Sequence, residues 1–217
     1  MDPIWPPFET IDEKTNQPVG FDVDLMNAIA QKGSLQIEFV NVPFDSALTG
    51  LSNCQYDAAI SAITITDDLK KTMFFSDPYL AGGQIVTVNI NNMDIKSKDD
   101  VVGKKVGAMS GTRGAIEAQK IPNVKYTAYD TIDQAFLDVM NGQIDAAITD
   151  NPKTIGIVGK DPTKIKTVGP VFTNENYGVA VCNKQPDLLS KINLGLAAVK
   201  ADGEIDQLVK KWLVSSR

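Results

Sequence analysis

An internal repeat is the feature that most constrains the fold of this chain. Residues 44–61 and residues 132–149 share a pattern at one constant offset. The identical residues, in pairs, are Asp45 and Asp133, Asn53 and Asn141, Gln55 and Gln143, and Asp57 and Asp145. Each segment predicts a helix, a turn and a short apolar strand, and this shared order of elements explains part of the sequence match. Two similar lobes account for it best, and facing lobes form a cleft of the kind in which small ligands bind.

Strands and helices alternate along the chain, which favours an α/β fold with parallel strands. The predicted strands are Leu35–Val40, Ala58–Ile60, Gly83–Asn89, Lys105–Met109, Lys125–Tyr129, Ala146–Thr149 and Tyr177–Val181. The predicted helices are Asp22–Lys32, Pro43–Leu51, a helix that begins at Thr66, Ala115–Gln119, a helix from Thr131 to Asn141, and Pro186–Trp212 with a break near Asp202.

We expect the chain to cross twice between the lobes, at Gly82–Asn89 and at Tyr177–Val181. Lobe 1 is then discontinuous and comprises residues 1–83 and 182–217, and lobe 2 is the inserted segment 84–181. Two parallel crossings form a hinge, which suits closure around a ligand.

Composition excludes several classes of protein. The net charge is −6 and there is no basic stripe, so we expect no nucleic-acid partner. Histidine is absent, which removes the commonest general base and most zinc sites, and we expect no metal and no cofactor. No apolar run reaches the roughly 20 residues of a membrane span, and we see no signal segment at the start of the sequence.

The two cysteines, Cys54 and Cys182, lie far apart and have no metal-ligand spacing. We expect two unpaired thiols rather than a disulfide, since sequence does not show that their Cα atoms come close enough to be bridged.

Polar residues follow three of the predicted strands. Ser61 and Thr64 follow Ala58–Ile60, the Ser110–Gly114 turn follows Lys105–Met109, and Asp150 follows Ala146–Thr149. Open α/β sheets bind ligands beyond the carboxyl ends of their strands. Backbone N–H groups at a helix start attract anions, and an acid can pair with an ammonium group. The structural alternatives are an ordinary strand-helix turn at Ser110–Gly114 and an Asx turn or helix N-cap at Asp150.

Four motifs in order carry a family resemblance: Gly20–Leu25, Thr64–Thr66, Phe75–Tyr79 and Ser110–Thr112. With them the chain resembles the polar-amino-acid solute-binding proteins of bacterial ABC importers. The resemblance implies a two-lobed, periplasmic-binding-protein-like α/β fold of type II, with two parallel-rich sheets, flanking helices and a two-strand hinge. It further implies capture of a small amino acid or related amine-bearing ligand for an ABC-transporter permease. The expected location is extracytoplasmic, either periplasmic or lipid-anchored at the cell surface.

The resemblance also implies roles for individual residues. Asp150 matches the aspartate that binds the ligand's α-amino group, and the segment that contains Thr112 meets its carboxylate. The remaining matched contacts are the aromatic residues Trp5 and Phe44 over the ligand side chain, the polar residue Asp2, and the strand-end residues Ser61, Ala62 and Thr64.

Two positions depart from the family pattern. Leu69 stands where the family carries an arginine that clamps the carboxylate, and Lys70 points about 100° further around a helix. Arg113 stands where small residues are usual. It is either a substitute clamp or a surface residue in the first turn of a helix.

Two other functions remain open at this point: a dehydratase similar to cyclohexadienyl dehydratase, and the ligand-binding domain of a sensor or receptor. We also expect association through lobe 1. Proteins of the resembling family begin with a strand just before the segment that matches Asp2–Phe8, and only Met1 precedes that segment here. Unpaired strand edges recruit other chains, so a homodimer is expected.

Overall fold

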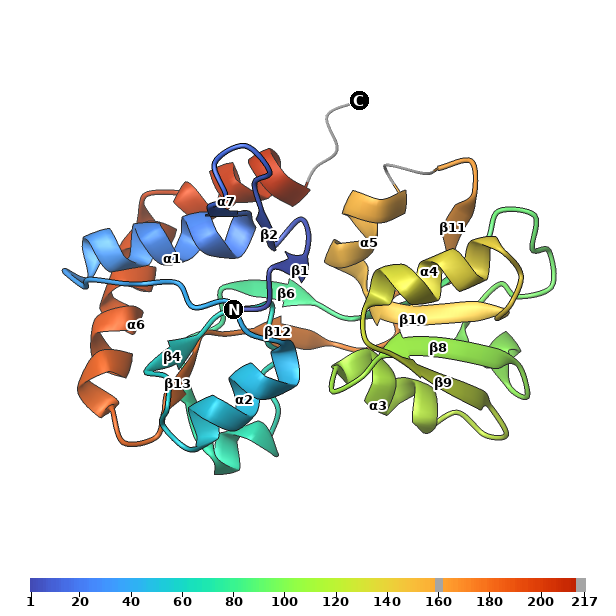
Figure 1. The fold of residues 1–217 in the computed structure, drawn as a ribbon, viewed down its shortest axis with the longest axis horizontal. Coiled ribbons are helices and arrows are strands. Elements are labelled where there is room, and N and C mark those ends of the chain that lie inside the picture. Colours follow the sequence, from blue (N-terminus) through green and yellow to red (C-terminus); the bar gives the residue numbers. More distant parts are fainter. Residues whose placement is uncertain (159–161, 214–217) are drawn as a thin grey trace. The chain divides into compact units, whose positions relative to one another are not determined.

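The computed structural model describes residues 1–158 and 162–213, which form two compact units (Figure 1). Unit 1 comprises Met1–Ala81 and Glu175–Arg217, and unit 2 is Gly82–Asn174. The sequence predicts boundaries between the two lobes at residues 83/84 and 181/182, whereas the boundaries between the two units lie at 81/82 and 174/175. Among the described residues, no helix is both long enough and apolar enough to cross a membrane.

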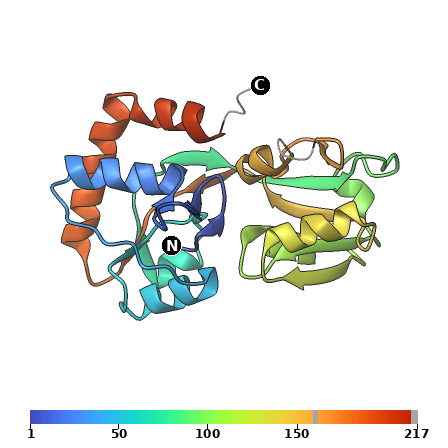
Figure 2. The ribbon, with the colours of Figure 1, turned by 45° about the horizontal axis from the view of Figure 1, so that its top comes forward.

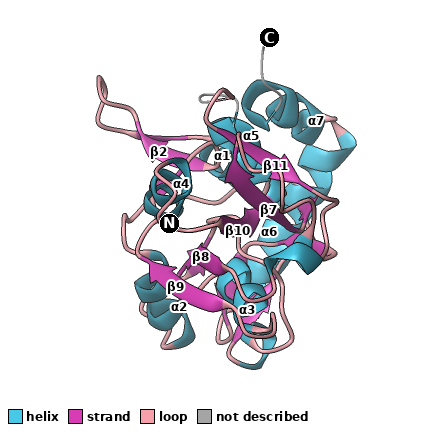
Figure 3. Ribbon diagram, turned by 90° about the vertical axis from the view of Figure 1, so that its right-hand side faces the viewer, coloured by secondary structure: helices cyan, strands magenta, loops and turns pink. Residues whose placement is uncertain are grey.

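Unit 2 is built on a mixed five-stranded sheet whose strand order is β11-β7-β10-β8-β9 (Figure 3). Its strands are β7 (Gln84–Asn89), β8 (Lys105–Met109), β9 (Lys125–Tyr129), β10 (Ala146–Asp150) and β11 (Ile165–Val168). Its helices are the 3-10 turn Lys98–Val101, α3 (Arg113–Gln119), α4 (Ile132–Met140) and α5 (Asn151–Val158). Strand β8 pairs in parallel with β9 and β10, whereas β7 pairs antiparallel with β10 and β11.

The core of unit 2 lies where this sheet meets its helices. It joins buried strand residues such as Val86, Val106 and Ile148 to Ala115 and Ala118 of α3. Helix α4 presents Ala135, Phe136 and Val139 as buried residues and is capped by a reciprocal pair of hydrogen bonds between Thr131 and Gln134. The helix predicted from Thr131 to Asn141 is therefore present, and the structure shows that it is amphipathic and capped.

Unit 1 contains shorter strands. Its elements are β1 (Ile4–Trp5), β2 (Glu9–Ile11), β3 (Pro18–Val19), α1 (Phe21–Lys32), α2 (Phe44–Ser52), β4 (Ala58–Ala59), the 3-10 turn Leu69–Lys71, β5 (Met73–Phe75), β6 (Leu80–Gly82, which ends at the unit boundary), β12 (Glu175–Tyr177), β13 (Ala180–Cys182), α6 (Pro186–Ala201), α7 (Glu204–Leu208) and the π-helical turn Val209–Leu213. Strands β1-β2-β3 form one antiparallel sheet, β4-β13-β5 form another, and β6 pairs with β12. Helices α1 and α6 pack against each other (Figure 2).

The α/β fold class is confirmed, but the expected parallel-rich sheet is wrong for unit 1. Its main sheet pairs β13 antiparallel with both β4 and β5. The predicted strand Leu35–Val40 is also wrong, because these residues form no regular element. Alternating apolar residues make a strand only when a neighbour supplies the ladder of hydrogen bonds. The segment after Thr66 forms a 3-10 turn at Leu69–Lys71 instead of a full helix, although Thr66 Oγ1 accepts a hydrogen bond from the Leu69 amide at 3.2 Å.

The expectation of two unpaired thiols is wrong as well. Cys54 and Cys182 form a disulfide, with their Cα atoms 5.2 Å apart. Cys54 follows α2, and Cys182 ends β13, which lies beside β4. Pairing of two strands that are distant in sequence therefore brings the two cysteines together. The sequence alone does not show which strands pair, so it does not predict this disulfide.

Candidate ligand-binding residues of the two units

The order of strands in unit 2 defines a topological switch point at β8. From β8 the chain passes through α3 to β9 on one side, and from β9 it returns through α4 to β10 on the other side of β8. Connections that leave neighbouring strands in opposite directions open a crevice at the strand ends. Two predicted site segments lie at this edge: Ser110–Gly114 follows β8, and Asp150 is the last residue of β10.

Asp150 is the last residue of β10 and is only 5% exposed. In the antiparallel register it lies opposite Gln84, whose Nε2 donates a hydrogen bond to Asp150 Oδ1 at 3.2 Å. A carboxylate withdrawn from water binds a cation more strongly than an exposed one does. The local geometry therefore suits Asp150 to hold an ammonium group.

The turn after β8 is held close to Asp150 by backbone packing. Gly111 has a φ of 73°, a left-handed conformation that glycine adopts without strain. A Cβ on Gly114 would lie 2.7 Å from the carbonyl oxygen of Ile148 and 3.0 Å from Gln84 Oε1. Glycine thus allows the start of α3 to contact the ends of β7 and β10. The Thr112 hydroxyl is engaged within this turn, since it caps α3 at the Ala115 amide (3.3 Å) and donates to the Met109 carbonyl (2.7 Å).

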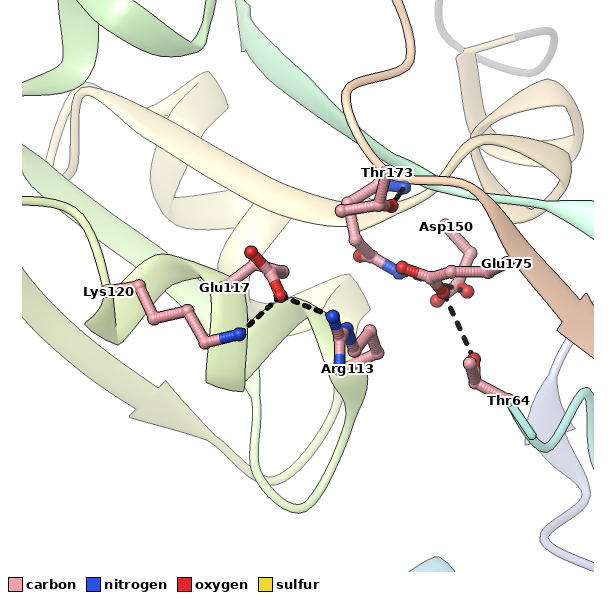
Figure 4. Close-up of polar contacts among 8 residues, drawn as sticks. Thr64, Arg113, Glu117, Lys120, Asp150, Thr173 and Glu175 are labelled. Carbon is pink, nitrogen blue, oxygen red and sulfur yellow. Dashed lines mark hydrogen bonds and ion pairs between the residues drawn. The ribbon is translucent and has the colours of Figure 1, made fainter. Parts of the chain in front are cut away.

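Arg113 belongs to a charged cluster on α3 (Figure 4). Its Nη2 lies 2.7 Å from Oε1 of Glu117, and Lys120 Nζ lies 2.9 Å from the same oxygen. The Glu117 side chain is 8% exposed and that of Arg113 is 29% exposed. Sequence reasoning did not identify Glu117, although its spacing of four residues from Arg113 is the ordinary spacing of a helical ion pair.

In unit 1, Ser61 and Ala62 contact two buried carboxylates. The Ser61 hydroxyl hydrogen-bonds Glu9 Oε1, and the Ala62 amide donates to Asp22 Oδ2 at 2.6 Å. Tyr79 OH donates to the same Asp22 oxygen at 3.1 Å. Burial raises the pKa of Asp22 to about 7, and its hydrogen bonds from Ala62 and Tyr79 oppose that rise in pKa only in part.

No pattern in the sequence indicates that Glu9 and Asp22 are buried. Asp22 was expected only as the start of an amphipathic helix, yet both carboxylates are 0% exposed. Acidic residues are common in the solvated first turn of a helix, so the position of Asp22 in the sequence does not distinguish a buried carboxylate from an exposed one. Ser61 and Ala62 are fixed by these acids, so their first role is to hold the loop after β4.

Thr64 lies further along the same loop, and its hydroxyl is bound within unit 1. Thr64 Oγ1 donates to Glu175 Oε2 at 3.1 Å (Figure 4), and Thr64 forms an isolated antiparallel bridge with Tyr177. Glu175 is 5% exposed and was not predicted as a site residue. Its position at the start of β12 became apparent only from the structure.

Asp2, Trp5 and Phe44 come from separate segments of unit 1. Asp2 Oδ2 accepts a hydrogen bond from the Phe44 amide at 3.0 Å, so Asp2 caps helix α2. The Asp2 amide donates to Ser61 Oγ at 3.4 Å. Trp5 is 7% exposed, and Phe44 packs partly against the cluster that contains Leu51 and Met73. The structure therefore brings Asp2, Phe44 and Ser61 together, with roles in the fold.

Leu69 packs against the same core cluster of unit 1. The apolar side chain of Leu69 is thus partly buried at the position where the resembling family has arginine. One further buried charge was missed: Lys153, in the first turn of α5, is 0% exposed. Within the described part of the chain, no group of three or more acidic or cysteine side chains is arranged to hold a metal.

Comparison with known proteins identifies the family to which the sequence is similar. The family model described as bacterial extracellular solute-binding proteins, family 3, matches residues 1–215. A probable histidine-binding protein of Neisseria gonorrhoeae is 36% identical over 213 residues, which are 95% of this chain and 78% of that protein. An arginine-binding periplasmic protein of Mannheimia haemolytica is 34% identical over 221 residues, 98% of this chain and 89% of that protein.

A solved structure is similar over nearly the whole chain. An ancestral arginine-binding protein bound to arginine has a TM-score of 0.91 and 37% identity, and the match covers 98% of this chain and 96% of that chain.

Proposed function

Because the chain belongs to family 3 of the bacterial extracellular solute-binding proteins, we propose that it captures a polar α-amino acid and delivers it to an ABC importer. Proteins of this family act outside the cytoplasm. The proposed capture of the ligand is the same whether the protein is periplasmic or lipid-anchored at the cell surface. The histidine and arginine named for two relatives support a ligand with a polar or cationic side chain. Because these relatives are named as binding proteins, capture is favoured over the dehydratase and sensor alternatives.

The observation that carries the proposal is Asp150 at the carboxyl end of β10, 5% exposed and in contact with Gln84. In our proposal its carboxylate pairs with the α-ammonium group of the ligand. The turn that contains Thr112 supplies backbone N–H groups to the ligand carboxylate, as a chain segment entering a helix does. Trp5 and Phe44 cover the ligand side chain, and Asp2, Ser61, Ala62 and Thr64 complete the polar shell.

The carboxylate of the ligand requires a separate proposal, because Leu69 replaces the arginine of the resembling family. We propose that Arg113 supplies the guanidinium instead. Its ion pair with the nearly buried Glu117 restricts the side chain, which lowers the entropy lost when a ligand carboxylate binds. The Arg113→Ala variant should then bind arginine about tenfold more weakly, the loss of roughly one charge-assisted hydrogen bond.

A matched control for Arg113→Ala is Lys120→Ala, because Lys120 contacts the same Glu117 oxygen. This control should leave the dissociation constant for arginine unchanged. Conversely, Leu69→Arg should strengthen the binding of arginine, since it places a guanidinium where the resembling family has one. Equal affinities for the parent and both Arg113→Ala and Leu69→Arg would remove both positions from the carboxylate site.

A thermal-shift panel tests the function itself. The panel contains arginine, histidine, lysine, glutamine and glucose. It also contains Nα-acetylarginine, which lacks the α-ammonium group, and agmatine, which lacks the carboxylate. A ligand at 100 times its dissociation constant stabilises the folded chain by about 2.7 kcal/mol. We expect a shift with at least one amino acid, a smaller shift with agmatine and none with Nα-acetylarginine. No shift with any amino acid, or equal shifts with arginine and its acetyl derivative, would contradict the proposal.

A further inference from the structure

Gln84 lies where the chain enters unit 2, and it is completely buried. Unit 2 begins at Gly82, and Gln84 is the first residue of β7. Gln84 is 0% exposed. A buried side-chain amide costs free energy unless its groups are hydrogen-bonded, so the contacts of this side chain indicate what it does.

The first contact of the Gln84 side chain is with the proposed ammonium site. Gln84 lies opposite Asp150 in the antiparallel pair of β7 and β10, and its Nε2 donates a hydrogen bond to Asp150 Oδ1 at 3.2 Å. An ionised carboxylate only accepts hydrogen bonds, and its two oxygens offer about four lone-pair positions. One bond from Gln84 therefore orients the carboxylate and still allows an ammonium group to bind to it.

The second contact of the side chain is with the start of α3. A Cβ on Gly114 would lie 3.0 Å from Gln84 Oε1, so the backbone of α3 comes close to the side-chain amide. This contact restricts the rotamers that Gln84 can adopt. The Gln84 side chain is thus close to both segments that we assign to the ligand, at Asp150 and at the turn that leads into α3.

The backbone of Gln84 contacts the segment at which the chain leaves unit 2. The Gln84 amide donates to Thr173 Oγ1 at 2.7 Å, and the Phe172 amide donates to the Gln84 carbonyl at 2.9 Å. A Cβ on Gly83 would lie 2.2 Å from the Thr173 carbonyl oxygen, so the two segments pack backbone to backbone. Unit 2 ends at Asn174. Gln84 therefore joins the entering and leaving segments of unit 2.

We propose that Gln84 is the positioning residue of the ammonium site, where its side chain orients Asp150 and its backbone links occupation of the site to the segments that enter and leave unit 2. This inference rests on the proposed binding of the ligand ammonium group to Asp150. An ammonium group that pairs with Asp150 restricts the carboxylate and, through it, the Gln84 side chain. The backbone hydrogen bonds of Gln84 then open less often, because they belong to the same local unit of structure.

Calorimetric titration of arginine and agmatine tests the positioning role. Gln84→Met keeps the length of the side chain and removes its amide. It should raise the dissociation constants of arginine and agmatine alike by about tenfold, because both offer an amine to Asp150 and one hydrogen bond to a charged group is lost. A loss confined to arginine, or no loss at all, would overturn the proposal.

Thr87→Val is the matched control. Thr87 belongs to the same strand and is also 0% exposed, but it pairs with Ala147 instead of Asp150. This variant should bind arginine as the parent does, and circular dichroism checks that both variants are folded. An equal loss of affinity in Thr87→Val would show that any disturbance of β7 impairs binding, and would overturn the specific role of Gln84.

A double-mutant cycle shows whether Gln84 acts through Asp150. In the Asp150→Ala background, Gln84→Met should change the dissociation constant of arginine less than about twofold, because the carboxylate that it orients is gone. A further tenfold loss would overturn the proposal. Parental affinity of Asp150→Ala, or no binding of any amino acid to the parent, would instead refute the proposed function. Weakened binding by Asp150→Ala with parental binding by Gln84→Met would refute the positioning role alone.

NMR on the parent protein tests both parts of the proposal even if Gln84→Met does not fold. Addition of arginine should shift the side-chain amide signals of Gln84, and those of the exposed Gln143 should stay in place. Bound arginine should slow exchange of the backbone amides of Gln84 and Phe172 by at least about threefold, and that of Val88 should not change. Unchanged Gln84 side-chain signals would overturn the positioning role, and unchanged exchange of the Gln84 and Phe172 amides would overturn the link to the segments that enter and leave unit 2.

Discussion

The repeated segments of the two units fold into equal helices and unequal strands. Helix α2 (Phe44–Ser52) and helix α4 (Ile132–Met140) occupy equivalent positions of the repeat and have nine residues each. Strands β4 and β10 both begin at equivalent alanines, Ala58 and Ala146. Strand β4 ends after two residues, whereas β10 continues for five residues to Asp150.

Neighbouring strands explain this difference. Strand β10 lies between β7 and β8 and is hydrogen-bonded on both sides, but among the described strands β4 is hydrogen-bonded only to β13. A helix makes its hydrogen bonds within one segment, and a strand makes them with other segments. The comparison teaches that similar local sequence fixes the helix, while the environment decides how far the following strand extends.

The largest effect should come from the equivalent isoleucines of these two strands. Ile148 is 0% exposed within the core of unit 2, whereas Ile60 is 4% exposed and lines a groove of unit 1 between residues 35–40 and β4. Ile148→Ala should lower the free energy of unfolding of unit 2 by about 4 kcal/mol, and Ile60→Ala that of unit 1 by about 2 kcal/mol, because the open groove relaxes around a smaller side chain. Hydrogen exchange in mild urea reports each unit separately. Equal losses in the free energy of unfolding for Ile148→Ala and Ile60→Ala would contradict the difference described between the two strands.

The disulfide gives unit 1 a constraint that unit 2 lacks among its described residues. Cys54 and Cys182 are separated by 128 positions, and both belong to unit 1. Cys54→Ser should lower the free energy of unfolding of unit 1 by about 3 kcal/mol, since the unfolded chain gains entropy. Hydrogen exchange of unit 2 should stay unchanged. Reduction of the parent protein should reproduce the effect, and a loss confined to unit 2 would contradict it.

A buried acid makes unit 1 the pH-sensitive half. The pKa of Asp22 rises from 3.8 to about 7 on folding, because the carboxyl is buried. The folded chain therefore holds a proton that the unfolded chain releases, and Asp22 makes stability fall as pH increases between these two pKa values. Asp22→Asn should flatten the decline in the thermal midpoint from pH 4.5 to pH 7. A variant with the same pH profile as the parent would show that Asp22 does not titrate as described.

The smallest effects should come from the two helix caps. Helix α4 is capped by Thr131, and α2 is capped by the distant Asp2. Thr131→Ala should lower the free energy of unfolding of unit 2 by about 1 kcal/mol, and Asp2→Ala should do the same to unit 1. Urea unfolding followed by hydrogen exchange distinguishes the units. An Asp2→Ala variant with parental stability would show that Asp2 contributes nothing to the stability of α2.

The sequence was sufficient for features that depend on local patterns. The helix after Thr131, the break near Asp202 and the strand Ala146–Thr149 all follow from periodicity and stop signals, and the structure contains them, with the strand one residue longer. The family motifs located the turn after β8. These features require no knowledge of which strands are neighbours.

Features that depend on strand pairing were missed. Leu35–Val40 has the alternation of a strand, yet no strand in the described part of the chain pairs with it. Cys54 meets Cys182 because β4 lies beside β13. Burial of Asp22, Glu117 and Lys153 follows from packing around side chains whose sequence context suits a helix surface. Pairing partners and burial of charged groups are properties of the assembled unit, so a single sequence does not reveal them.

The most direct test of the account is calorimetric titration of arginine, or of the amino acid that gives the largest thermal shift, into the parent and the Asp150→Ala variant. Asp133→Ala is the control, since Asp133 is an exposed carboxylate on α4 of the same unit. Removal of one partner of a desolvated charge pair costs about 3 kcal/mol, so the dissociation constant of Asp150→Ala should rise at least about a hundredfold. Asp133→Ala should bind as the parent does. An Asp150→Ala variant that is folded and binds the amino acid with the parental dissociation constant would contradict the account.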